Sequence, residues 1–461
     1  MPVALLSPLS LLPLWATLDA NVNSSRVEVG VAAMNVEDLV LISVDDHVIE
    51  PPGMFDAHIP GQYRDRAPKV LTDSDGSEYW QFEDERAAYM GLNAVAGCPP
   101  EEYGLNPTRY DQMRAGCYDV HQRVRDMSAN GVLASLNFPT FPHFCGQLFA
   151  RCKDKDLAIA VVRAYNDWHI DEWCGSYPER FIPCGITPFW DPELMAAEVR
   201  RIAAKGCHAV TFSENPEKLG HPSLHSSHWD PFWEACEDTQ TVVCLHIGSS
   251  STLLLTATDA PADVMISITP MNSFLALNDL MWTPVFGKFP RIKVAMSEGG
   301  IGWIPYALER MDYVFEHHHA WTGADFGGRR PSDVYREHVV TCFIDDASGL
   351  EQRHRVGVDS ITWECDYPHS DSTWPHSPEL LGKTLHGIPD DEIDKMTHLN
   401  AMRVYQFDPF SVRARERCTV GALRAEATDV DIAIRSLGRV NAGGTRASEL
   451  AAIARPKALD E

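Results

Sequence analysis

Leu39-Val40-Leu41-Ile42-Ser43-Val44-Asp45-Asp46-His47 is the stretch that decides the fold, because an apolar run ends in side chains that bind metal ions. Residues two apart on a strand project from one face, so Asp45 and His47 should point the same way. Two later segments end alike: Thr241-Val242-Val243-Cys244-Leu245-His246 and Ile361-Thr362-Trp363-Glu364-Cys365-Asp366. Any one of these residues taken singly is more often a turn former or a helix cap. Together they predict a site for Zn²⁺ or a related divalent ion with one position open.

Strand-like runs recur along the chain with amphipathic helical stretches between them, which is typical of a parallel sheet covered by helices. We expect eight strands, over 39–44, 132–138, 181–187, 209–212, 241–247, 292–296, 341–344 and 361–365. Eight strands in one continuous body favour an α/β fold of the (β/α)₈ TIM barrel type over an open doubly wound sheet. The three metal-type segments end the first, fifth and eighth strands, so this barrel would bring them to one face.

The segment between the first two strands is unusually long. Residues 51–120 exceed the length of a plain loop and contain a strand-like piece at 78–82. We therefore expect a small inserted β subdomain over the barrel mouth, where binding loops belong.

Both ends of the chain depart from the barrel pattern, which leaves 34–410 as the barrel itself. Within residues 1–33, the stretch 5–18 is apolar like the core of a signal peptide, but no Lys or Arg precedes it and Pro8 and Pro13 interrupt it. We expect a non-native or disordered extension with a native start at Met34, and a cleaved secretion signal is the alternative. Residues 411–461 are rich in Ala, Arg, Gly and Thr and should be peripheral or disordered.

Composition limits the partners of the protein. Asp and Glu number 65 against 39 Lys and Arg, for a formal charge of −26 over 461 residues. Such a surface argues against nucleic acid and against an anionic membrane, and leaves a small-molecule substrate. The twelve cysteines occur singly, with no C-x-x-C pair, which indicates free thiols and a cytoplasmic location.

In a TIM barrel the active site lies at the carboxyl ends of the strands, so the residues there form an inventory of the site. Besides the expected ligands, these positions carry further acids and histidines: Glu50, His143, Glu214, Glu298, Asp345, Asp346 and His369. So many carboxylates repel one another unless a cation or shared protons offset them, which supports a divalent ion. Glu50 could equally join the site or cap its loop, and His143 and His369 could equally orient substrate or play no part.

Two other clusters have simpler interpretations. Trp168 and Trp173 are spaced for one helix face, which indicates core packing. His317, His318 and His319 close a helix predicted from Trp303, where they complement the helix dipole, and we favour this over a metal-binding tract.

The order of the motifs resembles a known family. D-x-H follows the first strand, L-H-I-G the fifth, S-E-G-G-I-G-W-I-P the sixth and W-E-C-D-Y-P-H the eighth, with H-L-N-A at 398–401. As a set they resemble the amidohydrolase superfamily, specifically its branch related to aminocarboxymuconate semialdehyde decarboxylase. The resemblance covers about residues 38–410.

The resemblance implies one Zn²⁺, or alternatively Mn²⁺, held by Asp45, His47, His246 and Asp366, in a chain that forms a homodimer. Two positions depart from the branch. Its better-known decarboxylases usually have His or Glu at the position of Asp45, and a His where this chain has Glu298.

Two reactions stay open with these residues. In non-oxidative decarboxylation of a small carboxylated aromatic or ring-cleavage compound, Glu298 would protonate carbon as CO₂ leaves. In hydrolysis of an amide, ester or lactone, Asp366 or Glu298 would take the proton of a metal-bound water. His369 is a further catalytic candidate. The retained ligands disfavour a non-catalytic metal-binding barrel, and no G-x-S-x-G turn supports a covalent hydrolase.

Overall fold

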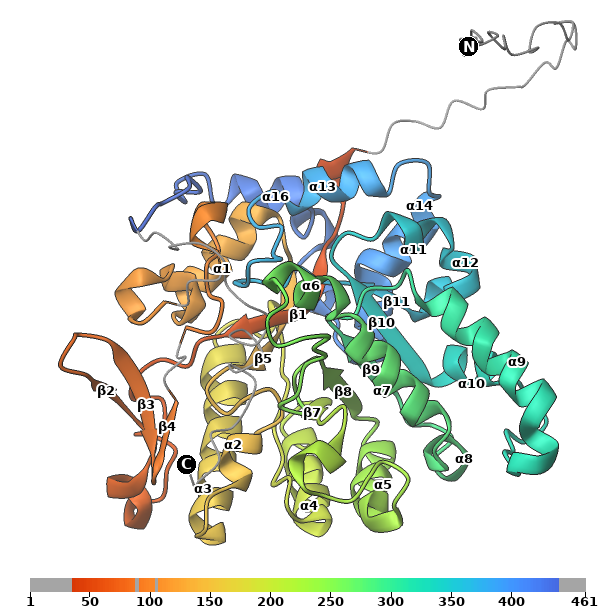
Figure 1. The fold of residues 1–461 in the computed structure, drawn as a ribbon. Helices are drawn as coiled ribbons and strands as arrows, with labels where there is room; N and C mark the ends of the chain where they lie inside the picture. Colours follow the sequence, from red (N-terminus) through yellow and green to blue (C-terminus); the bar gives the residue numbers. More distant parts are fainter. Residues whose placement is uncertain (1–34, 88–90, 104–106, 439–461) are drawn as a thin grey trace, which may run out of the picture. The chain divides into compact units, whose positions relative to one another are not determined.

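The computed structural model describes residues 35–87, 91–103 and 107–438, and a parallel sheet forms its centre (Figure 1). The strands run in the order β6-β5-β1-β11-β10-β9-β8-β7. Their bounds are β1 Ile42–Val48, β5 Ala134–Pro139, β6 Phe181–Ile182, β7 Ala209–Phe212, β8 Val242–His246, β9 Val294–Ser297, β10 Val339–Phe343 and β11 Ile361–Trp363.

A parallel bridge joins the two outermost strands of this order. Gly185, just after β6, pairs with Val210 of β7. The Gly185 amide donates to the carbonyl of Ala209, and the Thr211 amide donates to the carbonyl of Gly185. The ring of strands is thereby closed, and the predicted (β/α)₈ barrel is confirmed.

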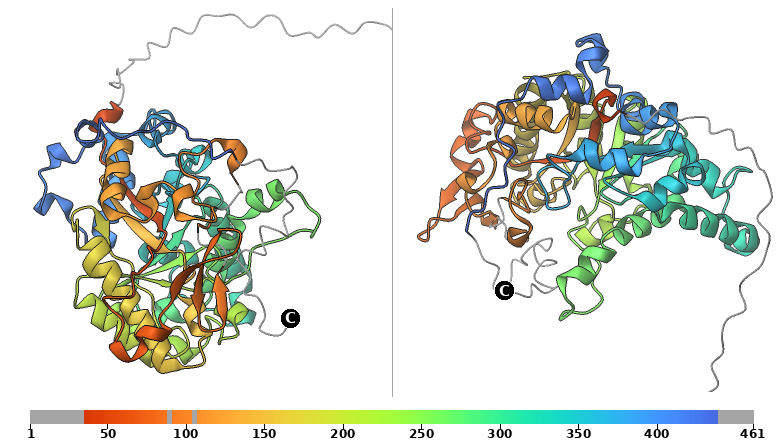
Figure 2. Two further views of the ribbon diagram at one scale, coloured as in Figure 1. Left: turned by 90° about the vertical axis from the view of Figure 1, so that its left-hand side faces the viewer. Right: turned by 90° about the horizontal axis from the view of Figure 1, so that it is seen from above.

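Helices connect the strands and surround them, as the two views of Figure 2 show. Their bounds are α1 Val120–Asn130, α2 Gln147–Ala150, α3 Lys155–Asp167, α4 Pro192–Ala203, α5 Asp230–Asp238, α6 Ala262–Ile268, α7 Met271–Met281, α8 Val285–Lys288, α9 Ile304–Thr322, α10 Pro331–His338, α11 Ala347–Glu351, α12 Arg353–Val356, α13 Ser377–Thr384, α14 Asp390–Asp394, α15 Asn400–Val404 and α16 Val420–Ala425. Two π-helical turns extend helices, at Trp168–Cys174 after α3 and at Lys395–Leu399 before α15.

Local sequence explains where these helices begin and end. Asp191 accepts hydrogen bonds from the first amides of α4, and Pro192 occupies its first position. Helix α9 continues to Thr322, five residues beyond His317, so the three histidines lie within its last turns rather than closing it. His317 and His319 contact the carbonyls one turn earlier through their Nδ1 atoms.

The insertion after β1 contains a three-stranded antiparallel sheet, which confirms the predicted subdomain. Its strands are β2 Lys69–Thr72, β3 Glu78–Phe82 and β4 Glu85–Ala87. Trp80 and Phe82 of β3 are buried, and Trp80 stacks on Phe141 after β5 with ring centroids 4.3 Å apart. Further along the insertion, the Val95 and Ala96 amides donate to the Pro368 carbonyl after β11. The insertion therefore packs on loops at the carboxyl ends of two strands.

The chain after residue 410 packs against the rest of the fold. Cys418 and Leu423 are fully buried and belong to a cluster of buried side chains that also includes Val40 and Ile42, and the Val420 amide donates to the Leu39 carbonyl before β1. Residues 411–427 are therefore ordered, because α16 offers apolar side chains for burial. Residues 1–33 and 439–461 lie outside the described residues.

Within the described ranges, no helix combines the length and the apolarity that crossing a bilayer requires. All twelve cysteines are described, and each is a buried free thiol.

Candidate metal centre

Strand β1 carries a bulge where the D-x-H motif begins. Its register against β5 shifts between Ser43 and Asp46, so the motif lies inside the strand and not just after it. A bulge bends a strand and redirects side chains. Asp45 and His47 face the site, whereas Asp46 accepts hydrogen bonds from the Ser43 and Ser135 hydroxyls and the Tyr367 amide. Asp46 thus ties β1 to its neighbours.

The four predicted metal ligands converge, although they come from three distant parts of the chain. The Nε2 atoms of His47 and His246 are 3.2 Å apart. Asp45 Oδ1 lies 3.6 Å from His47 Nε2 and 3.5 Å from His246 Nε2, and Asp366 Oδ1 lies 3.5 Å from His47 Nε2. Ligands about 2.0–2.1 Å from a tetrahedral ion are roughly 3.3 Å from one another. The spacing of Asp45, His47 and His246 fits one divalent ion, and Asp366 adjoins this group through His47.

These donors are also short of hydrogen bonds. Among the described residues, neither carboxylate oxygen of Asp45 has a hydrogen-bond partner, while Asp366 receives no backbone amide and lies against the imidazoles of His47 and His369; both carboxylates are fully buried. Buried polar groups without partners are rare because they lose hydration without compensation. A cation bound between the carboxylates would supply that compensation.

The protonation states of the cluster suit a cation. Burial, together with the charges of Asp366 and Asp46, raises the pKa of Asp45 well above its usual value. Burial alone would raise the pKa of Asp366, but the charge and hydrogen bonds of His369 and His47 hold it below its usual range. Burial lowers the pKa of His47, which keeps its imidazole in the neutral form that binds metals.

Glu298 stands at the open side of the cluster. It follows β9 with a left-handed backbone, φ +60°, and its Oε2 lies 3.5 Å from His246 Nε2. Its side chain is 24% exposed, while His246 is buried completely. Burial raises its pKa well above the usual value; the His246 charge opposes that shift, and the Asp366 and Asp45 charges add to it. A carboxyl group of raised pKa beside a metal site can carry a proton.

His369 stands beside the cluster as well. Its Nδ1 lies 3.0 Å from Asp366 Oδ1, and its ring stacks on His47 with centroids 3.8 Å apart. Its Nε2 is buried without a partner among the described residues. His369 therefore can bind the ion or move a proton, which supports the interpretation that gave it a role in the site.

Two phenylalanines form an apolar wall against the histidines. The Phe144 ring centroid is 4.2 Å from that of His246 and 5.4 Å from that of His47. Phe138 lies on the other side of His246, at 4.7 Å. Such a wall suits a flat aromatic substrate and keeps the imidazoles away from water.

Several predicted site residues lie elsewhere. Glu50 accepts hydrogen bonds from the Thr140 and Phe141 amides, so of its two interpretations the loop cap fits the structure. Three further acids bind loops or helices: Glu214 accepts from the Gly248 amide and the Ser250 hydroxyl, Asp345 from Thr384, and Asp346 from the Ile301, Gly302 and Gly349 amides. His143 lies outside the ligand groups, and burial with nearby Arg151 lowers its pKa to about 4.

Glu364 was not given a role by the sequence analysis. It is buried at the end of β11, where it accepts hydrogen bonds from the Cys342 thiol and the Glu298 amide. Donor atoms of Asp45, Cys342 and Glu364 all lie within 4.8 Å of one another. The sequence contained a signal for this residue. Glu364 lies two positions before Asp366, and residues two apart on a strand project from the same face.

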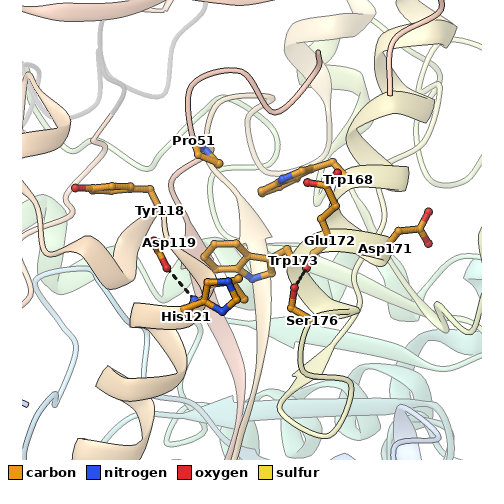
Figure 3. A pocket seen from close by; sticks show the side chains of 10 residues that line it. Pro51, Tyr118, Asp119, His121, Trp168, Asp171, Glu172, Trp173 and Ser176 are labelled. Carbon is orange, nitrogen blue, oxygen red and sulfur yellow. Dashed lines mark hydrogen bonds between the residues drawn. The ribbon is translucent and has the colours of Figure 1, made fainter. Parts of the chain in front are cut away.

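A separate cavity of about 440 Å³ opens on the outside of the barrel, between α1 and the π-helical turn after α3 (Figure 3). Trp168 and Trp173 line it, and both are buried, as expected for core residues. Its carboxylates have partners: Asp119 caps α1 and Glu172 pairs with His58. None of its lining residues belongs to the metal cluster.

Comparison with known proteins identifies the family. A family model described as Amidohydrolase matches residues 72–407. The chain belongs to the amidohydrolase family. The resemblance to the aminocarboxymuconate semialdehyde decarboxylase branch is confirmed too: 2-amino-3-carboxymuconate-6-semialdehyde decarboxylase of Dictyostelium discoideum is 24% identical over 310 residues, 65% of this chain and 80% of that protein.

Further relatives are decarboxylases. Gamma-resorcylate decarboxylase of Rhizobium sp. (strain MTP-10005) is 24% identical over 351 residues, 71% of this chain and 98% of that protein. The structure of 5-carboxyvanillate decarboxylase from Sphingomonas paucimobilis has a TM-score of 0.55 at 18% identity and covers 80% of this chain and 100% of its own. The enzyme of that name from Novosphingobium aromaticivorans, solved with manganese and 4-hydroxy-3-methoxy-5-nitrobenzoic acid, scores 0.54 at 17% identity over 81% and 97%.

Proposed function

We propose that this amidohydrolase-family enzyme is a metal-dependent, non-oxidative decarboxylase of a small carboxylated aromatic or ring-cleavage compound. One observation carries the proposal: two buried histidines and two buried carboxylates, which receive no backbone amide among the described residues, lie beside a carboxyl group and an apolar aromatic wall. The relatives that act on carboxylated aromatic acids support it.

Asp45, His47, His246 and Asp366 would hold the ion. When bound, the ion supplies positive charge that attracts a substrate carboxylate and an adjacent oxygen. Mn²⁺ has the support of the solved relative that contains it, whereas the imidazole donors also suit Zn²⁺.

The proton is the part of the reaction that the chain itself must supply. In decarboxylation the bond from carbon to the carboxyl group breaks, and that carbon gains a proton. Burial raises the pKa of Glu298, which favours the protonated carboxyl group, and Glu298 stands at the open side of the donors. We assign it the transfer to carbon, with His369 and Asp366 as the neighbours that orient the substrate and share the proton.

Hydrolysis is the second candidate, and the identity of residue 298 favours it. A carboxylate in this position could take a proton from water before attack on an amide, ester or lactone carbonyl. The same donors would serve both reactions.

The proposal also includes the cellular location of the protein and its oligomeric state. Twelve buried free thiols support the reducing cytoplasm. The acidic surface supports a small-molecule substrate and no nucleic acid, and the family resemblance supports a homodimer.

The test combines metal analysis with two substrate panels. The purified protein, loaded with Mn²⁺ or Zn²⁺, is assayed for CO₂ release from hydroxylated benzoic acids and for acid release from amides, esters and lactones. CO₂ release that requires the metal is the expected result. Acid release alone would establish the hydrolase, and turnover unchanged by metal removal would contradict both.

A further inference from the structure

We propose that Glu364 is a positioning residue that fixes the backbone of Glu298 and thereby aims its carboxyl group at the metal centre. This inference rests on the proton-transfer role proposed for Glu298. Glu364 itself lies beneath the site, 1% exposed, and we assign it no contact with substrate.

The backbone at Glu298 needs support from its surroundings. Its φ of +60° lies in the left-handed region, which side chains other than glycine seldom occupy because Cβ crowds the following carbonyl. Such conformations persist at functional sites only when neighbouring contacts hold them. The direction of the Glu298 side chain depends on this angle, because the Cα–Cβ bond turns with the backbone.

Glu364 supplies the contact at the residue concerned. The Glu298 amide donates to Glu364 Oε2 over 3.2 Å, and the Cys342 thiol donates to the same oxygen. These three residues come from β9, β10 and β11, which are adjacent in the sheet. The amide at the end of β9 therefore reaches across β10 to a carboxylate from β11, and the thiol between them orients that carboxylate.

The rest of the turn after β9 has its own supports. Asp346 Oδ2 accepts from the Ile301 amide over 2.8 Å and from the Gly302 amide over 2.6 Å. The Trp303 indole donates to the Gly299 carbonyl over 2.7 Å. Removing the acceptor at Glu364 should thus release Glu298 while the following residues stay in place, which makes Asp346 a matched control.

The variants separate positioning from general destabilisation. Glu364→Met keeps the length of the side chain but removes the acceptor, and we expect kcat to fall about 10²-fold, the cost of a misplaced reacting group. Glu364→Gln retains an oxygen that accepts from the Glu298 amide and should recover most of that loss. If Glu364 acts through Glu298, the double variant Glu298→Gln, Glu364→Met should be no slower than Glu298→Gln. Metal content is measured in each variant.

A second readout does not depend on catalysis. Hydrogen–deuterium exchange of the metal-free protein should become faster in the peptide that contains Glu298 in Glu364→Met, whereas Asp346→Ala should expose the Ile301 and Gly302 amides instead. If Glu364→Met does not fold, Cys342→Ala removes the orienting thiol and should show the same exchange signature to a smaller extent.

The outcomes also distinguish the two proposals. Multiplied losses in the double variant, or unchanged exchange at Glu298, would overturn the positioning role while leaving the proposed function intact. Parent-like turnover by Glu298→Gln would overturn the proton-transfer role itself, and the exchange experiment would still report whether Glu364 holds the backbone.

Discussion

Two sets of buried carboxylates lie at the mouth of this barrel, and their hydrogen bonds set them apart. Asp45 and Asp366 receive no backbone amide among the described residues, whereas Glu50, Glu214 and Glu364 each accept from one. A buried carboxylate that receives amide donors is stabilised in part by the protein itself. One that receives none needs a cation or a proton. The first set therefore marks the metal site, and the second holds the loops around it.

The largest expected effect falls on the metal site that the first set marks. In His246→Ala the remaining donors lose the imidazole that lies 3.5 Å from Asp45 and 3.2 Å from His47. We expect metal retention and turnover to be lost together, measured by elemental analysis and by the substrate assay. Full metal occupancy in this variant would contradict the ligand assignment.

Glu298 belongs to neither set, and its replacement should separate proton transfer from metal binding. Glu298→Gln keeps the shape of the side chain but cannot donate the proton. We expect a loss of about 10²–10⁴-fold in kcat, the usual range for a general acid or base, with metal content near that of the parent. Parent-like turnover would transfer the role to His369 or Asp366.

We expect the second set of carboxylates, which accept backbone amides, to make the stability of the protein depend on pH. Burial raises the pKa of Glu50 to about 7, and the amides of Phe141 and Thr140 only partly oppose the shift. The folded protein therefore holds a proton at Glu50 more tightly than the unfolded chain. The stabilisation is complete below the unfolded pKa of about 4.5 and is lost as pH rises through about 7.

Unfolding by urea in the metal-free parent and in Glu50→Gln measures this effect. We expect the free energy of unfolding of the parent, relative to the variant, to fall by about 3 kcal/mol between pH 4.5 and 8. A constant difference across this range would show that Glu50 is ionised in the folded protein throughout.

The smallest effect is expected at Asp346, a half-buried acid of the loop-holding kind. Asp346→Ala removes the acceptor for three backbone amides that begin α9 and α11. We expect a loss of about 2 kcal/mol in the free energy of unfolding, as for a helix cap, and unchanged metal content. Loss of the metal in Asp346→Ala would contradict the division of the carboxylates into a set that binds the metal and a set that holds the loops.

Much of the site was predictable because residue types that bind metals directly follow or end apolar, strand-like runs. Asp45, His47, His246 and Asp366 each follow or end an apolar run, and the structure places them in two overlapping groups that share His47. Glu364 was missed because it lies within such a run, where a carboxylate looks like part of the strand. The bulge in β1 was missed too, since one extra residue in a strand leaves no mark in an apolar pattern.

The roles of the other acids could not be predicted from the sequence. Glu50, Glu214 and Asp346 follow strands just as the ligands do, and only the positions of donor amides far away in sequence assign them to loops. The burial of Cys418 and Leu423 could not be predicted for a similar reason, because a short helix in a polar tail shows no strand pattern.

By itself, the sequence determined the barrel, the inserted β subdomain and the convergence of three strand ends, because apolar periodicity dictates which faces are buried and parallel strands must end together. Only the tertiary structure decided which carboxylates face one another without donors and which receive an amide. That distinction depends on distances between groups that lie 34 to 91 positions apart in the chain, and local sequence does not specify these distances. The left-handed backbone of Glu298 is the clearest case, since its support comes from Glu364, 66 positions further along the chain.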